Sequence, residues 1–124
     1  MFVPSNDLIA SADREFIESE GGADVQPMKV NTTTLDDILE RNAITRIDFL
    51  SLDVELHEPM VLKGFSIDRF QPRLACVESH LEVRQQILDY FAAHNYVLVG
   101  KYLRADTENM WFTVRSRSVH NPLP

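Results

Sequence analysis

Glycine is scarce in this chain of 124 residues, which contains only four. They are Gly21, Gly22, Gly64 and Gly100, so no G-x-G pattern can follow a strand and open a helix. A turn of that kind lets the backbone approach the phosphates of a dinucleotide or a related cofactor. The sequence therefore offers no residues that we can assign to cofactor binding.

Cysteine is rarer still, with Cys76 as the single example. One cysteine cannot form an internal disulfide, which fits a reducing cytoplasm, so we expect a cytoplasmic protein. Because Cys76 lies in the apolar run at 74–77, we predict a buried structural thiol rather than a nucleophile. Long apolar runs are also missing, so neither a signal peptide nor a membrane span is predicted.

Positive charge is in the minority, with 12 Lys and Arg against 19 Asp and Glu and a formal net charge of -7. No run of Lys or Arg interrupts this acidity. Nucleic acid and anionic membranes are therefore poor candidates for partners, because the mean field repels phosphate. A small or neutral molecule is a better candidate for the substrate. The apolar fraction of 44% and the charged fraction of 25% are typical of one soluble globular domain.

The pattern of residues predicts an α/β layer structure. Residues 1–24 are polar and interrupted by Pro4 and two glycines, and we expect an irregular, mobile segment there. Pro27 restricts residues 25–33 to an edge strand. Thr34 and Asp37 form a capping pair for a helix that Asn42 ends. The predicted buried stripe of that helix consists of Leu35, Ile38 and Leu39.

Further along, residues 47–54 are apolar enough for a parallel strand covered on both faces. Pro59 can start a short helix that Gly64 ends. Residues 74–78 form a second buried strand, and a helix follows at 82–94 whose apolar face consists of Val83, Ile87, Tyr90 and Phe91. Residues 96–103 and 110–114 are two strands joined by a loop at 105–109, which adds an antiparallel hairpin. Residues 116–124 are a frayed tail.

Polar residues follow the two predicted parallel strands at the point where each ends. The first ends at Asp53 and Glu55, followed by His57 and Glu58, and the second ends at Glu78, followed by His80. Ligands bind beyond the carboxyl ends of such strands, so these groups can gather around one site as a general base or as metal ligands. The alternative is that polar strand ends are simply solvated. In that reading His57 and Glu58 are solvated at the start of a helix, where the helix dipole favours Glu58. We interpret His94 and His120 as surface residues.

The order of these motifs resembles the signature of the FkbM-family methyltransferases. That signature has T-L-D-D, then a strand ending in D-x-E-G, then a helix with E-x-x-V-L-K-G. Here residues 33–39 read TTLDDIL, residues 47–55 read IDFLSLDVE, and residues 57–64 read HEPMVLKG. Residues 72–78, PRLACVE, look like the next strand of the family, and residues 109–113, NMWFT, look like its aromatic closing strand. The resemblance covers about residues 25–115.

The resemblance implies a class I, Rossmann-like fold with a seven-stranded sheet whose last strand is antiparallel. This chain matches the carboxyl-terminal half, strands four to seven. Family members move a methyl group from S-adenosylmethionine (SAM) to an oxygen of a sugar or another secondary metabolite. The strand and D-x-G-A-x-x-G turn that bind SAM are absent from this sequence. We therefore expect a fragment that does not bind SAM alone and is inactive alone.

By the same resemblance, Asp53 and Glu55 are the catalytic pair that orients or deprotonates the acceptor hydroxyl. His57, Glu78 and His80 support the acceptor side, and the small-molecule acceptor is the expected partner. Leu56 departs from the family, because it stands where the signature has glycine. A leucine does not easily adopt positive φ, so the geometry of this loop is an open question.

Two other functions compete with methyl transfer. The first is a truncated, non-catalytic module that associates with a partner chain, or with a second copy, through the exposed edge of the strand that ends at Asp53. The second is a small metal-dependent enzyme. It would use Asp53, Glu55, His57 and His80, but their spacing matches no specific metal motif, so we name no metal ligands.

Overall fold

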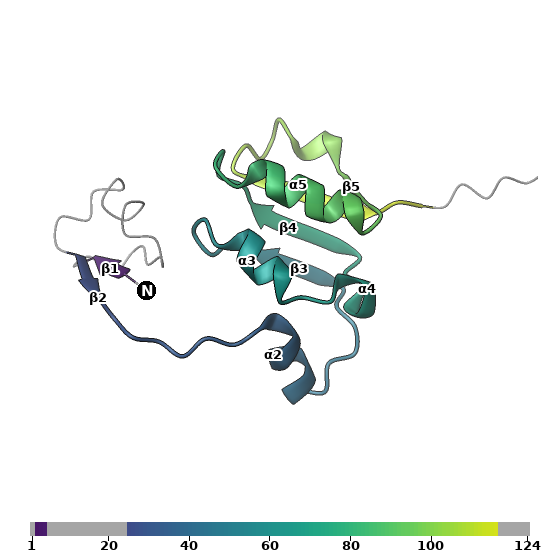
Figure 1. Ribbon diagram of the computed structural model, residues 1–124. Coiled ribbons are helices and arrows are strands. Elements are labelled where there is room, and N and C mark those ends of the chain that lie inside the picture. Colours follow the sequence, from purple (N-terminus) through teal and green to yellow (C-terminus); the bar gives the residue numbers. More distant parts are fainter. Residues whose placement is uncertain (1, 5–24, 117–124) are drawn as a thin grey trace, which may run out of the picture.

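The computed structural model describes residues 2–4 and 25–116 (Figure 1). Its strands and helices, in chain order, are β1 (Phe2–Pro4), β2 (Val25–Pro27), α2 (Leu35–Arg41), β3 (Phe49–Leu52), α3 (Glu58–Lys63), α4 (Ile67–Phe70), β4 (Leu74–Glu78), α5 (Arg84–Ala93), β5 (Tyr96–Leu98), the 3-10 helix η1 (Gly100–Tyr102) and β6 (Asn109–Val114). β1 and β2 pair antiparallel as a separate two-stranded sheet. The predictions for residues 5–24 and 117–124 concern positions outside this described part.

A four-stranded sheet with the order β3-β4-β6-β5 forms the centre of the fold. β3 and β4 are adjacent and parallel, with Phe49 opposite Leu74 and Leu52 opposite Val77. β6 runs antiparallel to both of its neighbours, β4 and β5. The predicted mixed α/β fold, its parallel pair and its closing antiparallel hairpin are therefore confirmed.

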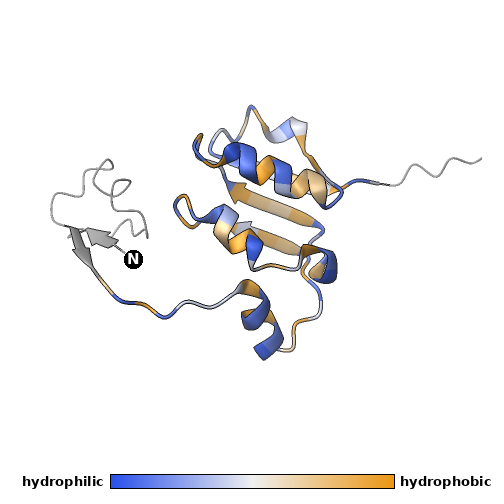
Figure 2. Ribbon diagram, viewed as in Figure 1, coloured by the Kyte–Doolittle hydropathy of each residue, from blue (hydrophilic) through white to orange (hydrophobic). Residues whose placement is uncertain are grey.

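Helices α3 and α5 cover one face of this sheet (Figure 1). Figure 2 shows β4 as largely hydrophobic, whereas helix α5 has both hydrophobic and hydrophilic residues. Helix α5 buries the side chains of Ile87 and Phe91, and its N-cap residue Val83 is buried too, as the predicted stripe requires. Tyr90, the fourth residue of that stripe, is partly buried. Phe91 stacks on Phe112 of β6 with ring centroids 4.0 Å apart. The core therefore lies between α3, α5 and one face of the sheet.

The other face of β3 is open. Leu50 and Leu52 are buried, whereas Phe49 is 51% exposed and Ser51 is also exposed. The prediction of a strand covered on both faces is wrong for β3, because the covering helices α3 and α5 share one side of the sheet. In β4, Cys76 is buried as predicted, and this burial raises the pKa of its thiol.

Helix α2 begins and ends at the residues that the sequence predicts. Thr34 accepts a hydrogen bond from Asp37 N at 3.1 Å, and Asn42 is the C-cap. The buried stripe is narrower than predicted, because Leu39 is buried but Ile38 is 45% exposed. A helix of seven residues contacts the core over little more than one turn, so Ile38 stays outside it.

Two predicted strands are shorter than expected. The strand at 25–33 is limited to Val25–Pro27, and the strand at 96–103 ends at Leu98. After Leu98 the chain turns into η1, which places the ring of Tyr102 5.2 Å from that of Trp111. The β-forming residues after Leu98 therefore do not extend the strand, because their side chains pack against the sheet instead. No helix in residues 25–116 is long and apolar enough to span a bilayer.

Candidate functional site

The turn after β3 has unusual backbone geometry. His57 N donates to Val54 O at 3.3 Å, and the two residues between them have positive φ, 51° for Glu55 and 73° for Leu56. Two consecutive left-handed residues are the hallmark of a type I′ turn, which favours glycine or asparagine. Leu56 therefore keeps the left-handed conformation that the glycine of the family signature would favour. Its side chain is partly buried and packs against the core.

Glu58 opens helix α3 directly after this turn and is completely buried. Its Oε1 accepts a hydrogen bond from Val54 N at 2.9 Å. Its Oε2 is also buried and has no hydrogen-bond partner among the described residues. The alternative reading, in which Glu58 is solvated, is therefore wrong. The buried residue Leu62 lies one helical turn further on, so both side chains lie on the covered face of α3.

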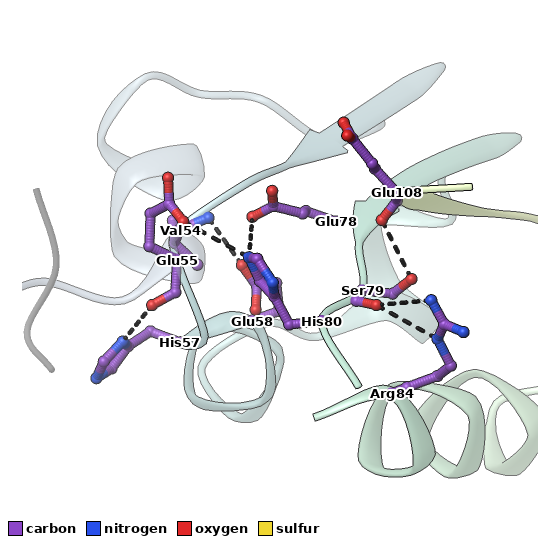
Figure 3. Close-up of polar contacts among 9 residues, drawn as sticks. All are labelled: Val54, Glu55, His57, Glu58, Glu78, Ser79, His80, Arg84 and Glu108. Atoms are coloured by element: carbon purple, nitrogen blue, oxygen red, sulfur yellow. Dashed lines mark hydrogen bonds and ion pairs between the residues drawn. The ribbon is translucent and has the colours of Figure 1, made fainter. Parts of the chain in front are cut away.

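Glu78 and His80 reach the same place from the end of β4 (Figure 3). His80 Nε2 lies 3.3 Å from Glu78 Oε2 and 3.6 Å from Glu55 Oε2. These groups meet because β3 and β4 are parallel neighbours, so their carboxyl ends lie at one edge of the sheet. His80 therefore links the turn after β3 to the end of β4.

The carboxylates of this cluster hold their protons more strongly than isolated ones do. Burial, followed by the hydrogen bond and the negative charge of Asp53, raises the pKa of Glu78 to about 7, and His80 opposes that rise. Burial and then the charge of Asp53 also raise the pKa of Glu55. Groups that titrate near neutrality can exchange protons with a substrate, which is a common property of active sites.

The loop after β4 is fixed from two sides. Ser79 is buried, and its N–H donates to Glu108 O at 2.9 Å. The guanidinium of Arg84 donates to Ser79 O through Nη2 at 3.0 Å and Nε at 3.3 Å (Figure 3). Beside this loop lies a cavity of about 370 Å³, lined by Glu78, Ser79, His80, Leu81, Arg84, Thr107 and Glu108. Its volume is at the lower end for small-molecule sites.

The structure brings four of the predicted site residues together and leaves one aside. Asp53, Glu55, Glu78 and His80 share the edge of the sheet, as the adjacent strands predict. His57 precedes α3 with its Nδ1 3.1 Å from Glu55 O, and its ring points away from the carboxylates (Figure 3). Of the two histidines predicted to lie at the surface, His94 forms a hydrogen bond with Asp68. His120 lies outside the described residues.

Sequence reasoning missed Glu58, the most buried member of the cluster. The spacing of Glu58 from Val61 and Leu62 gives the signal, because positions i, i+3 and i+4 of a helix share a face. Leu62 is 1% exposed and Glu58 is 0% exposed, so the apolar face of this short helix includes a carboxylate.

These features define a mixed α/β protein with ionisable groups gathered where two parallel strands end. The family model described as the methyltransferase FkbM domain matches residues 4–98, and the chain therefore belongs to the FkbM methyltransferase family. The search of curated proteins and the search of solved structures gave no match.

The described residues do not by themselves fit SAM, the cofactor that this family implies. Gly64 caps α3, and a Cβ added there would lie 3.1 Å from Thr34 Cβ, so this glycine serves helix packing. Gly100 follows β5 but opens only the three-residue η1. Neither glycine forms a phosphate or ribose cradle between a strand and a long helix.

Proposed function

We propose that this chain forms the acceptor half of a SAM-dependent methyltransferase that methylates a hydroxyl oxygen of a sugar or another secondary metabolite. The observation that supports this function is the meeting of Asp53 and Glu55 with Glu78 and His80 at the carboxyl ends of β3 and β4. Membership of the FkbM family supports methyl transfer as the reaction.

The chemistry of methyl transfer suits this arrangement. The reaction is a direct displacement, so it requires an aligned acceptor and a group that takes the hydroxyl proton. Asp53 is exposed and the side chain of Glu55 is 25% exposed, so a bound hydroxyl can reach both. The cavity beside Glu78 and His80 offers room for part of a small acceptor.

The topology is consistent with the carboxyl-terminal half of a Rossmann-like methyltransferase domain. β6, the last strand, is antiparallel and lies between β4 and β5, whereas β3 and β4 are parallel. We propose that the SAM cradle of the intact family domain comes from residues that this chain lacks. The chain alone should then neither bind SAM nor transfer methyl groups.

Two measurements on the purified chain test this proposal. Calorimetry with SAM should show no saturable binding, and a site of micromolar strength would contradict the half-domain assignment. Amide chemical shifts recorded with a panel of neutral sugars and polyols should move at 53–57 and 78–81. The variants Asp53→Asn and Glu55→Gln should weaken that response, whereas the exposed Glu82→Gln should not. A response that is unchanged in both site variants would refute the acceptor site.

A second candidate function is a non-catalytic module that associates with another chain. β3 is the terminal strand of its sheet, so its outer edge has no paired strand among the described residues. Such edges pair readily with other strands. Sedimentation over a range of concentrations should then reveal a dimer that Ser51→Lys disrupts, because Ser51 is exposed and a lysine blunts an edge. A monomer at all concentrations would exclude self-association.

A further inference from the structure

Three carboxylates from two strand ends and a helix start converge within a small volume. Asp53, Glu58 and Glu78 each offer one oxygen, and these three oxygens all lie within 4.8 Å of one another. An acidic cluster alone does not define a site, because exposed carboxylates gather on many surfaces. The burial of its central member distinguishes this one.

Glu58 is the residue that points to a ligand. It is 0% exposed, and only one of its two carboxylate oxygens is hydrogen bonded, to Val54 N at 2.9 Å. Its Oε2 has no hydrogen-bond partner in the part of the chain that the structure describes. A buried carboxylate oxygen without a donor is unfavourable unless it is protonated or binds a cation. Asp53 and Glu78 beside it bring further carboxyl groups and no cationic donor.

We infer that Asp53, Glu58 and Glu78 bind a hard divalent cation of the Mg²⁺ or Mn²⁺ type. The donor set consists of carboxylate oxygens, which these ions prefer over softer metals. Two positive charges offset most of the negative charge that the three carboxylates bring together. Asp53 is exposed and Glu78 borders the cavity, so the ion can enter and keep water ligands on its open side.

A second group of possible metal ligands also contains Glu78, and it has to be distinguished from the proposed cation site. Glu55, Glu78 and His80 also offer ligand atoms within 4.8 Å of one another. Their imidazole lies between the two carboxylates, 3.6 Å from Glu55 and 3.3 Å from Glu78, where it serves as their partner. The two buried atoms of this group, Glu78 Oε2 and His80 Nε2, lie 3.3 Å apart and form an ion pair with each other. The buried Oε2 of Glu58 has no hydrogen-bond partner among the described residues.

Cation binding can be measured without SAM or a methyl acceptor, so its outcome is independent of the proposed methyl transfer. The probe is Mn²⁺, titrated into the purified chain at neutral pH and followed by the electron paramagnetic resonance signal of the free ion. We expect saturation at one Mn²⁺ per chain and displacement by Mg²⁺. Thermal unfolding in the presence of either ion should shift to higher temperature.

Matched variants locate the ion. Glu58→Gln keeps the acceptor for Val54 N but removes the charge, and it should weaken Mn²⁺ binding by about tenfold or more. Asp53→Asn changes an exposed residue, so it should fold normally and show the same weakening if Glu58→Gln proves unstable. Glu82→Gln, an exposed acidic residue outside the cluster, should bind Mn²⁺ like the wild type.

Three results would overturn the inference. The first is the lack of saturable Mn²⁺ binding at millimolar concentration. The second is binding that Asp53→Asn and Glu58→Gln leave unchanged, because the ions would then lie elsewhere on the acidic surface. The third is binding that His80→Gln abolishes while Glu58→Gln does not, because the ion would then belong to the group around His80.

Discussion

Replacing Leu56 separates the strain of the turn after β3 from the packing of its side chain. Leu56 has φ 73° and also packs against the core. Leu56→Ala removes the packing and keeps the strain, whereas Leu56→Gly removes both. Comparing these two variants therefore isolates the backbone contribution, because the lost side chain is nearly the same in each.

The expected order of stability is the reverse of the usual one. A left-handed conformation costs a residue with a Cβ about 1–2 kcal/mol, and glycine costs about 0.5–1 kcal/mol more unfolded-chain entropy than alanine. Leu56→Gly should therefore be more stable than Leu56→Ala by about 0.5–1 kcal/mol. Leu56→Gly also loses the packing of a side chain that is partly buried. A fully buried leucine is worth about 1.5–3 kcal/mol, so about half of that value is lost here, and this loss offsets the relief of strain. Leu56→Gly should consequently lie within about 1 kcal/mol of the wild type.

Urea unfolding, analysed as two-state with equal slopes, measures these differences. Leu88 provides the control, because it is also partly buried against the core but lies inside helix α5 with ordinary helical φ. There alanine should be more stable than glycine by about 1 kcal/mol. If the Leu56 variants show the same order as the Leu88 variants, the assignment of a strained left-handed turn is wrong.

Three other changes give independent checks. Ala43 is exposed with φ 54°, so Ala43→Gly should raise the free energy of unfolding in urea by about 0.5–1 kcal/mol. Tyr96→Phe should cost about 1–2 kcal/mol, because the buried hydroxyl donates to Pro72 O at 2.8 Å. Burial raises the pKa of Tyr96 to about 12, so the wild type should lose stability as pH rises from about 10 towards that value, and Tyr96→Phe should lose less in alkaline melts. The bond from the Trp111 indole to Asp106 lowers the pKa of that carboxyl, so Asp106→Asn should reduce the melting temperature at neutral pH but not in acid, where the wild-type carboxylate protonates.

Local chemistry predicted those parts of the fold that depend on neighbours in the sequence. The cap at Thr34 and the helix between Pro59 and Gly64 are determined by side chains within a few residues, and the structure contains both. The parallel pairing of β3 and β4 follows from the intervening helices, which make a crossover necessary. These features needed no knowledge of distant contacts.

Features that depend on tertiary cover were not predictable in the same way. The apolar run around Phe49 suggests burial on both faces, but only packing decides whether a second layer covers the strand. The β-rich segment after Leu98 turns into η1 because Tyr102 packs beside Trp111. The spacing of Glu58 from Val61 and Leu62 indicates that it shares their face of α3, but its complete burial results from how α3 packs on the sheet.

Leucine at position 56 does not by itself abolish the turn that positions the candidate site. Two interactions hold the left-handed backbone in place: the hydrogen bond from Val54 N to the buried Glu58 carboxylate, and the packing of the Leu56 side chain against the core. The same hydrogen bond directs Glu58 towards Asp53 and Glu78. The strain of the turn and the buried carboxylate therefore belong to one structural unit, and the loss of the family glycine affects its stability more than its geometry.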